Sequence, residues 1–462
     1  MLKVTRRSFV GGSAALIAAP AIGAPTELAD VPVAIVGAGA AGIAAARRLQ
    51  AAKVRFVLLE ASASAGGRCV TDTKTFGVPF DRGAHWIHRP SDNSLAKDAS
   101  GFDVYPAPRG QQLRVAPRRA RESELEQYLA ALVRANRAIV DAGRSVDRPA
   151  ASVLPGDLGE WRSSVEFALG PYGVGRSLSS VSSADYARAA ERNGDAFCRQ
   201  GYGALLARLA AGIPMHLSTP AQRIDWGGAI LVDTPKGTVR ARTAIVTVST
   251  SVLANGALTF TPELPKSHAD AIAALPLGHV ENIALELTGN PFGLEPDDLV
   301  FERASGPRTA ALLGNVGGGP LSVVSVGGNF ARDLSRLGED AMIGFAVEWL
   351  THMFGSDAKR SVTQAAATRW TGDTLYGGAF SVALPGRASA RRALTMPLRD
   401  RVWFAGEAVH ETLWGSVDGA WQSGVRAADA AMRVVADIAG AKGSKENGRS
   451  QPKSKRGKRP RR

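Results

Sequence analysis

The sequence predicts an α/β fold with two domains, one of which is assembled from segments far apart in the chain. Residues 31–60 show a buried strand, a turn, an Ala-rich helix and a second strand. Residues 216–253 alternate short β runs with Gly-Gly and Pro-Lys-Gly turns, and residues 401–440 return to a strand and a long helix. These first, middle and last segments are expected to form one discontinuous domain.

The remaining segments predict a second domain of mixed α and β structure. Spaced Leu, Tyr and Val residues predict an amphipathic helix over residues 120–143. Past Pro262 the pattern is again mixed. We therefore expect the discontinuous domain at 25–87, 205–255 and 395–440, and the second domain at 88–204 and 256–394. The ends of the chain, 1–24 and 441–462, lie outside both.

The basic character of the chain comes from its two ends. Most of the formal net charge of +14 lies in residues 441–462, with a smaller share in residues 1–24, so the body is nearly neutral. The last segment lacks large apolar side chains, which predicts a disordered tail. Two interpretations of the tail remain, a contact with anionic lipid or nucleic acid and a solvated end without a partner. No nucleic acid is expected to bind the folded body.

Cysteine and histidine usage excludes several kinds of site. Cys69 and Cys198 are too few for a disulfide framework, and either one bridge or two packed thiols fits. The seven histidines are scattered, so we expect no metal site and find no Ser/His/Asp triad. After the first segment, no run is long and apolar enough to span a membrane.

A glycine-rich loop marks the first βαβ unit as a dinucleotide site. Gly37, Gly39 and Gly42 form G-x-G-x-x-G between a strand and a helix, and Glu60 ends the next strand. The glycines permit a tight turn, close approach to a pyrophosphate and close packing of helix on strand. A carboxylate at position 60 suits a ribose hydroxyl and disfavours a 2′-phosphate, so NAD or FAD fits better than NADP. The alternative is a cluster of packing glycines.

Three further motifs carry a resemblance to a known family. They are "EASASAGGRC" after the second strand, "FDRGAHWIH", and "FAGEAVHETLWGSVDGAWQSG" near the end. With these motifs in this order, the chain resembles the flavin-containing amine oxidases, a family that includes monoamine, polyamine and spermine oxidases. The resemblance runs from about Val31 to Ala436. It implies a Rossmann-like FAD-binding domain of the glutathione-reductase type and a mixed α+β substrate domain.

The resemblance implies FAD contacts along the whole discontinuous domain. The glycine loop and the start of its helix would bind the diphosphate, the end of the second strand a ribose, and the motifs around 83–86 and 406–420 the flavin and ribityl chain. The implied contacts are Gly37, Gly39, Ala40, Ala41, Gly42, Glu60, Ala61, Gly67, Arg68, Gly83, Ala84, His85, Trp86, Ala221, Gly406, Glu407, Ser416, Val417 and Ala420.

The implied reaction moves a hydride from the carbon beside an amine nitrogen to flavin N5, giving an imine. Because the cofactor supplies the chemistry of this step, the protein needs only a pocket that excludes water and orients the amine. Candidate catalytic residues are Asn282, Phe380, Trp370 and His85. Asn282 stands where the family has a lysine that holds a water near flavin N5. Without that lysine, the reduced flavin could pass its electrons either to O2 or to another periplasmic electron acceptor. Ala379 replaces the cysteine that links FAD covalently in some members, so the FAD is expected to be non-covalent, and Ser416 replaces one of two aromatic rings that flank the amine.

Three different functions on the same scaffold remain open. Amino-acid oxidases of this superfamily carry an arginine for the substrate carboxylate where this chain has Trp86, although Arg89 lies close by in sequence. A desaturase of a hydrophobic substrate and a non-catalytic flavin-bound envelope protein are also compatible with these motifs. The expected partner is a small-molecule amine, with a polyamine as one option.

The first segment predicts export. "TRRSFVGG" precedes a soft apolar run with small residues near position 24, and it resembles the twin-arginine signal of bacterial export. That resemblance implies the twin-arginine machinery as a partner, transport of a folded chain that already holds its FAD, and a periplasmic or secreted location. An ordinary signal or a coincidental arginine pair is the alternative.

Overall fold

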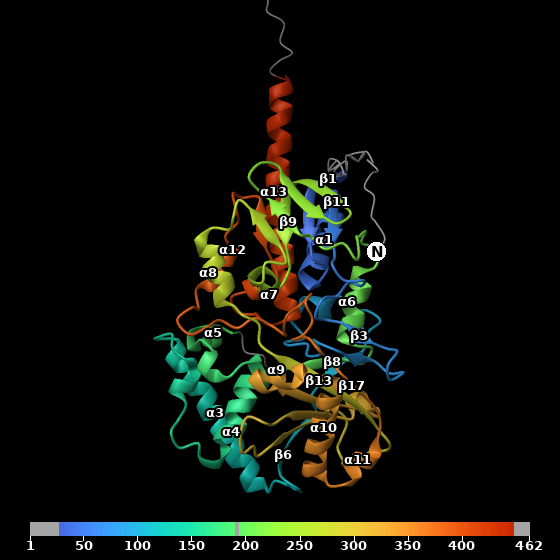
Figure 1. The fold of residues 1–462 in the computed structure, drawn as a ribbon, viewed down its shortest axis with the longest axis vertical. Coiled ribbons are helices and arrows are strands. Elements are labelled where there is room, and N and C mark those ends of the chain that lie inside the picture. The colour runs from blue at the N-terminus through green and yellow to red at the C-terminus, as the bar shows by residue number, and fades with distance from the viewer. Residues whose placement is uncertain (1–26, 190–193, 448–462) are drawn as a thin grey trace, which may run out of the picture.

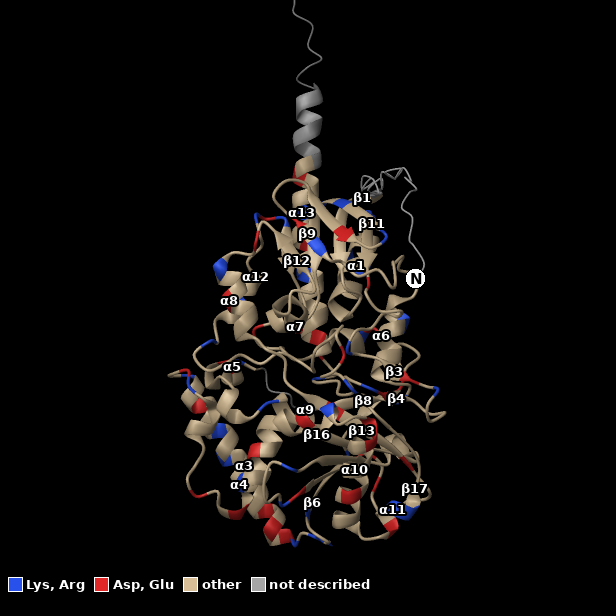
Figure 2. Cartoon of the chain, viewed as in Figure 1, with Lys and Arg blue, Asp and Glu red and all other residues tan. Residues whose placement is uncertain are grey.

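The computed structural model describes residues 27–189 and 194–447 as two lobes built on separate sheets. The upper lobe in Figure 1 contains the N-terminal strand, the long C-terminal helix and a segment from the middle of the chain, residues 202–274, whereas the lower lobe contains the chain on either side of that segment, around 110–188 and 280–367. Positions of basic and of acidic residues are spread over both lobes in Figure 2, which agrees with a nearly neutral body. The α/β class predicted from the sequence is confirmed.

The first sheet has a parallel centre and an antiparallel flank. Its strands run in the order β12-β9-β10-β11-β1-β2, and β18 also pairs with β11. The first half of β11 pairs antiparallel with β10 and its second half pairs parallel with β18. The strands are β1 Glu27–Val36, β2 Phe56–Leu59, β9 Arg223–Asp225, β10 Ile230–Thr234, β11 Gly237–Val246, β12 Thr259–Thr261 and β18 Val402–Phe404.

Alternation along β1 divides the upper lobe into two cores. Val33 and Ile35 face a core with α1 and α13, whereas Ala34 and Val36 face the opposite core, because successive side chains of a strand point to opposite faces. The helices of the first core are α1 Ala40–Ala51, α6 Tyr202–Ala210 and α13 Val417–Asn447, and those of the second are α8 Lys266–Ala274 and α12 Ala390–Thr395, with α7 Thr250–Ala254 alongside.

The second sheet is mixed and lies between two layers of helices. Its order is β17-β13-β16-β15-β14-β6-β7. Val300 of β14 faces one core, and its neighbours Leu299 and Phe301 face the other. The strands are β6 Gly110–Val115, β7 Arg118–Arg119, β13 Val280–Leu287, β14 Asp298–Glu302, β15 Ala311–Gly314, β16 Leu321–Gly327 and β17 Val362–Ala367. The helices are α3 Glu122–Gly143, α4 Arg162–Phe167, α5 Ser183–Arg188, α9 Gly328–Arg336, α10 Glu339–Phe354 and α11 Asp357–Ser361.

Short elements connect the two lobes. Two small ladders and one short helix carry the chain between the sheets. They are β3 Thr71–Asp72 with β4 Phe80–Asp81, β5 Val104–Pro106 with β8 Ala196–Cys198, and α2 Ser94–Lys97. Single helical turns lie at 150–153, 159–161, 168–172, 178–180, 316–318 and 407–409.

The cores show which segments pack together. Leu258 and Ile272 from the predicted second domain, and Leu394 at its end, belong to the core of the first sheet. The domain boundaries themselves stay a prediction. The structure differs at the tail, because α13 continues to Asn447 where disorder was expected from residue 441. No proline interrupts this stretch before Pro452, and its alanine and lysines favour a helix, although Gly440 and Gly443 do not.

Cys69 and Cys198 are both buried free thiols, so no bridge joins them. Within residues 27–189 and 194–447, no helix is both long and apolar enough to cross a membrane. The same residues hold no cluster of His, Cys, Asp and Glu suited to a metal ion.

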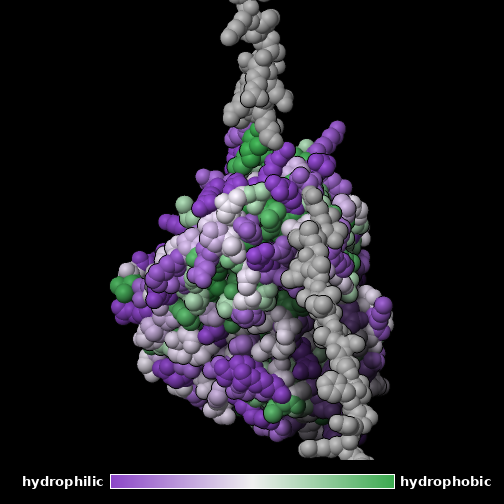
Figure 3. Space-filling model, turned by 45° about the horizontal axis from the view of Figure 1, so that its top comes forward, coloured by the Kyte–Doolittle hydropathy of each residue, from purple (hydrophilic) through white to green (hydrophobic). Residues whose placement is uncertain are grey.

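The face in Figure 3 is largely hydrophilic, with small and separate hydrophobic patches.

Candidate active site

One cavity of about 760 Å³ runs between the lobes and gathers the predicted site residues. Every implied cofactor contact and candidate catalytic residue lines it except Gly42, which packs behind the loop. Segments from the beginning, the middle and the end of the chain all contribute. Its size is within the usual range for cofactor and ligand pockets.

The glycine loop is shaped for close approach. Gly37 has φ +101°, and its N–H donates to the Leu59 carbonyl at 2.7 Å. A Cβ on Gly42 would lie 1.8 Å from the Gly37 oxygen, so only glycine fits there. The Thr247 hydroxyl, which no sequence motif marks, lies 2.9 Å from the carbonyl oxygens of both Val36 and Gly37 and fixes the loop from the end of β11.

The start of α1 has open donors. Gly39 caps this helix without a side-chain hydrogen bond, and Ala40 and Ala41 line the cavity. The first N–H groups of a helix lack intrahelical partners, and the helix dipole favours an anion beside them. The residues present therefore fit a diphosphate.

Glu60 closes the same end of the cavity. Its carboxylate accepts hydrogen bonds from the backbone N–H groups of Ala38 at 2.6 Å and Ser62 at 2.8 Å. Each oxygen keeps a further lone pair, so the carboxylate can still accept from a ribose hydroxyl. Ala61 and Ala221 line the wall beside it.

Arg68 and Glu407 form an ion pair across the cavity wall. Arg68 donates to the Ala379 carbonyl at 2.6 Å and to Glu407 at 3.1 Å. Glu407 also accepts from the Ser381 N–H and hydroxyl and from the Gly415 N–H, at 2.7 to 3.0 Å. These donors fill the usual acceptor positions of a carboxylate, so a ribityl hydroxyl would have to displace one of them.

The charge on Glu407 is held in place by its neighbours. Burial alone would raise the pKa of this carboxyl group. The guanidinium groups of Arg68 and Arg391, with the hydrogen bonds from Ser381, outweigh burial and hold the pKa below its usual value. Glu407 is therefore an ionised buried carboxylate.

Asn282 and Trp370 meet at one backbone carbonyl. The Asn282 side-chain N–H₂ and the Trp370 indole N–H both donate to the Arg82 oxygen at 3.1 Å. The Ser325 hydroxyl donates to the Asn282 side-chain oxygen at 2.8 Å. The carboxylate of buried Glu281 accepts a hydrogen bond from the backbone N–H of Trp370 at 3.0 Å. Neither residue carries a sequence motif. Ser325 is brought here by the pairing of β16 with β13, and Glu281 is the neighbour of Asn282 on β13.

Aromatic rings form the other wall. Trp370 and Tyr376 pack edge to face with centroids 5.1 Å apart, and Phe380 lies against Gly415. Ser416 caps the start of α13, since its hydroxyl accepts from the Gly419 N–H at 3.0 Å. The second ring of the aromatic pair is therefore absent at position 416, and Trp370 and Tyr376 supply aromatic surface from another segment.

Two histidines of the "GAHWIH" motif are each paired with an aspartate. His85 Nδ1 lies 2.8 Å from the carboxylate of buried Asp81, and the His85 ring packs against Phe197. Asp81 also accepts a hydrogen bond from the Tyr202 N–H. His88 Nδ1 lies 2.7 Å from Asp195, and both residues line the cavity. Asp81 stands just before this motif in the sequence, whereas Asp195 is brought in by the fold and had no sequence signal.

The lower lobe supplies an apolar surface to the same cavity. Leu299, Leu313 and Val323 of the second sheet line it, as does Tyr172. Cys69 and Ala379 also line it. Burial raises the pKa of the Cys69 thiol well above its usual value, which keeps it protonated and unreactive.

Comparison with known proteins gives the family. The sequence model of the flavin containing amine oxidoreductases matches residues 146–432, and that of an NAD(P)-binding Rossmann-like domain matches residues 35–99. The chain is 26% identical to lysine-specific histone demethylase 2 of Homo sapiens, over 92% of this chain and 56% of that protein. It is 28% identical to polyamine oxidase 2 of Arabidopsis thaliana, over 87% of this chain and 88% of that one.

Solved structures share the fold. Cyclohexylamine oxidase from Brevibacterium oxydans IH-35A superposes with a TM-score of 0.73 at 21% identity, covering 88% of this chain and 99% of that one. A variant of putrescine oxidase gives 0.74 at 18% identity with the same coverage. The Rossmann-like domain and the mixed-sheet second domain expected from the sequence are confirmed. The chain belongs to the flavin-containing amine oxidoreductase family, is an enzyme, and uses FAD as its cofactor.

Proposed function

We propose that this enzyme oxidises a primary or secondary amine to an imine, using FAD that is bound without a covalent link. The observation that carries the proposal is the continuity of the cavity. Its glycine-loop end fits a dinucleotide, and its other end is lined by Trp370, Tyr376 and Phe380. Aromatic faces attract the ammonium form in which an amine enters the pocket, before it loses its proton.

The chain's own residues select and orient the substrate. A bound flavin supplies the hydride acceptor. The apolar surface from Leu299, Leu313 and Val323 excludes water and favours the uncharged amine over its ammonium form. Asp195, beside His88, provides a carboxylate for a second, still charged, nitrogen, which favours a diamine or polyamine as one option within the class. Asn282, held by Ser325 and the Arg82 carbonyl, presents a neutral amide at the reacting end.

Two features support a non-covalent cofactor. Ala379 has no side chain able to form a thioether, and the protonated Cys69 thiol is a poor nucleophile. Acid precipitation of the purified protein should therefore leave all the flavin in the supernatant. Flavin retained in the pellet would contradict this part of the proposal.

We also propose twin-arginine export to the periplasm or beyond. Residues 1–24 lie outside the described residues, so support comes from the sequence and from the cavity's construction. First, middle and last segments all line the cavity, and an unfolded chain could not carry FAD across a membrane. Replacing both arginines, Arg6→Lys with Arg7→Lys, should leave the protein inside the cell. Continued export of that variant would overturn the proposal.

Anaerobic mixing tests the reaction. The yellow protein should be bleached by primary or secondary amines from a panel that includes monoamines, putrescine and spermidine, and not by α-amino acids. Mixing the reduced protein with O2 or with a c-type cytochrome then identifies the acceptor. Bleaching by α-amino acids or a polyene alone would favour an amino-acid oxidase or a desaturase. A flavin that no member of the panel reduces would favour a non-catalytic protein.

A further inference from the structure

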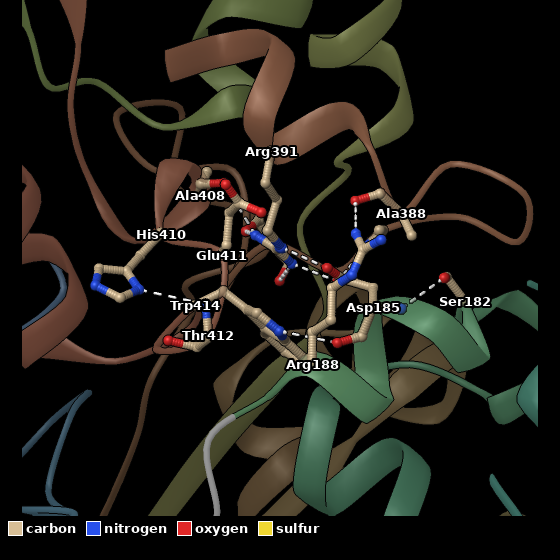
Figure 4. A network of polar contacts seen from close by, with 12 residues as sticks. Ser182, Asp185, Arg188, Ala388, Arg391, Ala408, His410, Glu411, Thr412 and Trp414 are labelled. Atoms are coloured by element: carbon tan, nitrogen blue, oxygen red, sulfur yellow. Dashed lines mark hydrogen bonds and ion pairs between the residues drawn. The ribbon is translucent and has the colours of Figure 1, made fainter. Parts of the chain in front are cut away.

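A buried ion pair behind the cavity wall has no part in the proposed reaction. Arg391 of α12 and Asp185 of α5 form a two-pronged pair, with Nε and a terminal nitrogen each 2.8 Å from a carboxylate oxygen. Both side chains are 1% exposed. Figure 4 shows the Trp414 ring beside the pair, 4.7 Å from the guanidinium carbon, and its indole N–H donates to the Asp185 carbonyl.

The pair connects the two lobes. Helix α12 packs in the core of the first sheet, whereas α5 packs against α3 of the lower lobe. Removing two charges from water is costly, and an apolar pair of similar volume is often as stable. Stability alone therefore does not explain why this pair is present. We look for its role in the residues that it holds in place.

The remaining donors of Arg391 are directed at Ser381. One terminal nitrogen donates to the Ser381 hydroxyl at 2.9 Å and to the Ala408 carbonyl at 3.0 Å, and the other lies 3.2 Å from the Ser381 carbonyl. The N–H and hydroxyl of Ser381 donate to Glu407 at 3.0 and 2.7 Å. Two side chains, one cationic and one anionic, thus hold every polar group of this residue.

Ser381 follows directly on two residues that line the cavity, Ala379 and Phe380. The carbonyl of Ala379 accepts from Arg68, and Arg68 also pairs with Glu407. A shift of Ser381 would therefore move the Phe380 ring at the amine end and Arg68 at the cofactor side together. Asp185, Arg391, Ser381, Glu407 and Arg68 form one continuous polar chain.

We propose that Arg391 is a positioning residue that acts through Ser381 to hold Phe380 against the amine and Arg68 and Glu407 against FAD. The proposal rests on the function proposed above. The planar fork of arginine is essential to it, because the guanidinium must reach Asp185, Ser381 and Ala408 at once. A lysine keeps the charge but cannot reproduce the fork.

Arg391→Lys is the direct test, and Arg392→Lys is its matched control. Arg392 is the next residue of α12, is largely exposed and pairs with Glu411 away from the cavity. We expect Arg391→Lys to raise the FAD dissociation constant of the apoprotein, and the amine concentration for half-maximal anaerobic reduction, each by about tenfold. Arg392→Lys should leave both values as in the wild type.

Ser381→Ala provides a second variant that keeps the buried pair intact. We expect the same two quantities to rise by about fivefold, and the urea midpoint of the apoprotein to fall, because the hydrogen bonds of the hydroxyl with Glu407 and Arg391 are lost. Both quantities are measured on folded protein without urea, so they report on positioning and not on the loss of stability. If Arg391→Lys does not fold, Ser381→Ala decides alone.

Wild-type values of both quantities in folded Ser381→Ala would overturn the inference, and so would wild-type values in folded Arg391→Lys. Failure of the proposed function gives a different result, because then the wild-type protein itself would not be reduced by any amine. The FAD dissociation constant is measured without substrate, so it reports on positioning in either case.

Discussion

The two ends of the cavity are built in different ways. The phosphate end, residues 37–42, is a continuous backbone motif whose conformation depends on glycines and on Thr247 behind them. The aromatic end, Asn282, Trp370 and Phe380, is made of side chains, of which Asn282 and Trp370 are held by the carbonyl of Arg82. A substitution in the first kind of site is therefore expected to move the whole loop, whereas one in the second is expected to change a single contact.

The largest effect is expected at the phosphate end. Gly42→Ala places a methyl group 1.8 Å from the Gly37 oxygen, so the loop must move. We expect a loss of about 3 kcal/mol in the free energy of unfolding and loss of bound FAD. Urea unfolding and flavin absorbance measure the two effects. Gly228→Ala is the control, since nothing lies within 4 Å of its added methyl group, and it should stay within about 0.5 kcal/mol of wild type.

An intermediate effect is expected at Glu407, which joins the two ends. Glu407→Gln should cost about 2 kcal/mol of unfolding free energy at neutral pH, because hydrogen bonds to a charged acceptor are lost. The folded-state pKa of Glu407 lies below its usual value of 4.5. Its stabilisation is therefore complete above about 4.5 and disappears as the pH falls through the lower folded pKa.

Unfolding curves of wild type and Glu407→Gln should accordingly converge in acid and separate towards neutral pH. Glu411→Gln is the matched control, because Glu411 pairs with Arg392 at the surface and the exchange should cost less than about 1 kcal/mol. A constant difference between wild type and Glu407→Gln at all pH values would mean that Glu407 is not the titrating group.

The smallest effect is expected at the aromatic end. Phe380→Leu removes a ring face and keeps apolar volume, so we expect the amine KM to rise about tenfold while FAD content stays at the wild-type level. Steady-state kinetics and flavin absorbance test both statements. Phe330→Leu serves as control, since Phe330 packs on Phe345 away from the cavity. An unchanged KM in Phe380→Leu would place the amine elsewhere.

The same contrast explains what the sequence could predict. The β1-α1-β2 unit, its glycines and Glu60 are contiguous, so local pattern and spacing were enough. The helix expected over 120–143 appears as α3 because its apolar spacing is regular. Asn282, Trp370 and Phe380 could be named only through a resemblance, because their meeting depends on how the two sheets pack.

Several features had no local signal. Asp195, Ser325 and Arg391 are ordinary polar residues in the sequence and gain their roles from partners far along the chain. Position 416 illustrates the reverse case. A missing ring was inferred there from the resemblance, and the serine found in its place caps the start of a helix, a role that the "GSVDG" stretch is compatible with but does not reveal.

Anaerobic reduction by an amine and by the same amine deuterated at the carbon beside nitrogen tests the central claim most directly. If the cavity brings that carbon to the flavin, wild-type protein will be bleached by the amine, and the deuterated form will react more slowly because its C–D bond is broken in the step. No bleaching by any primary or secondary amine, in folded protein whose flavin is still reduced by dithionite, would contradict the claim.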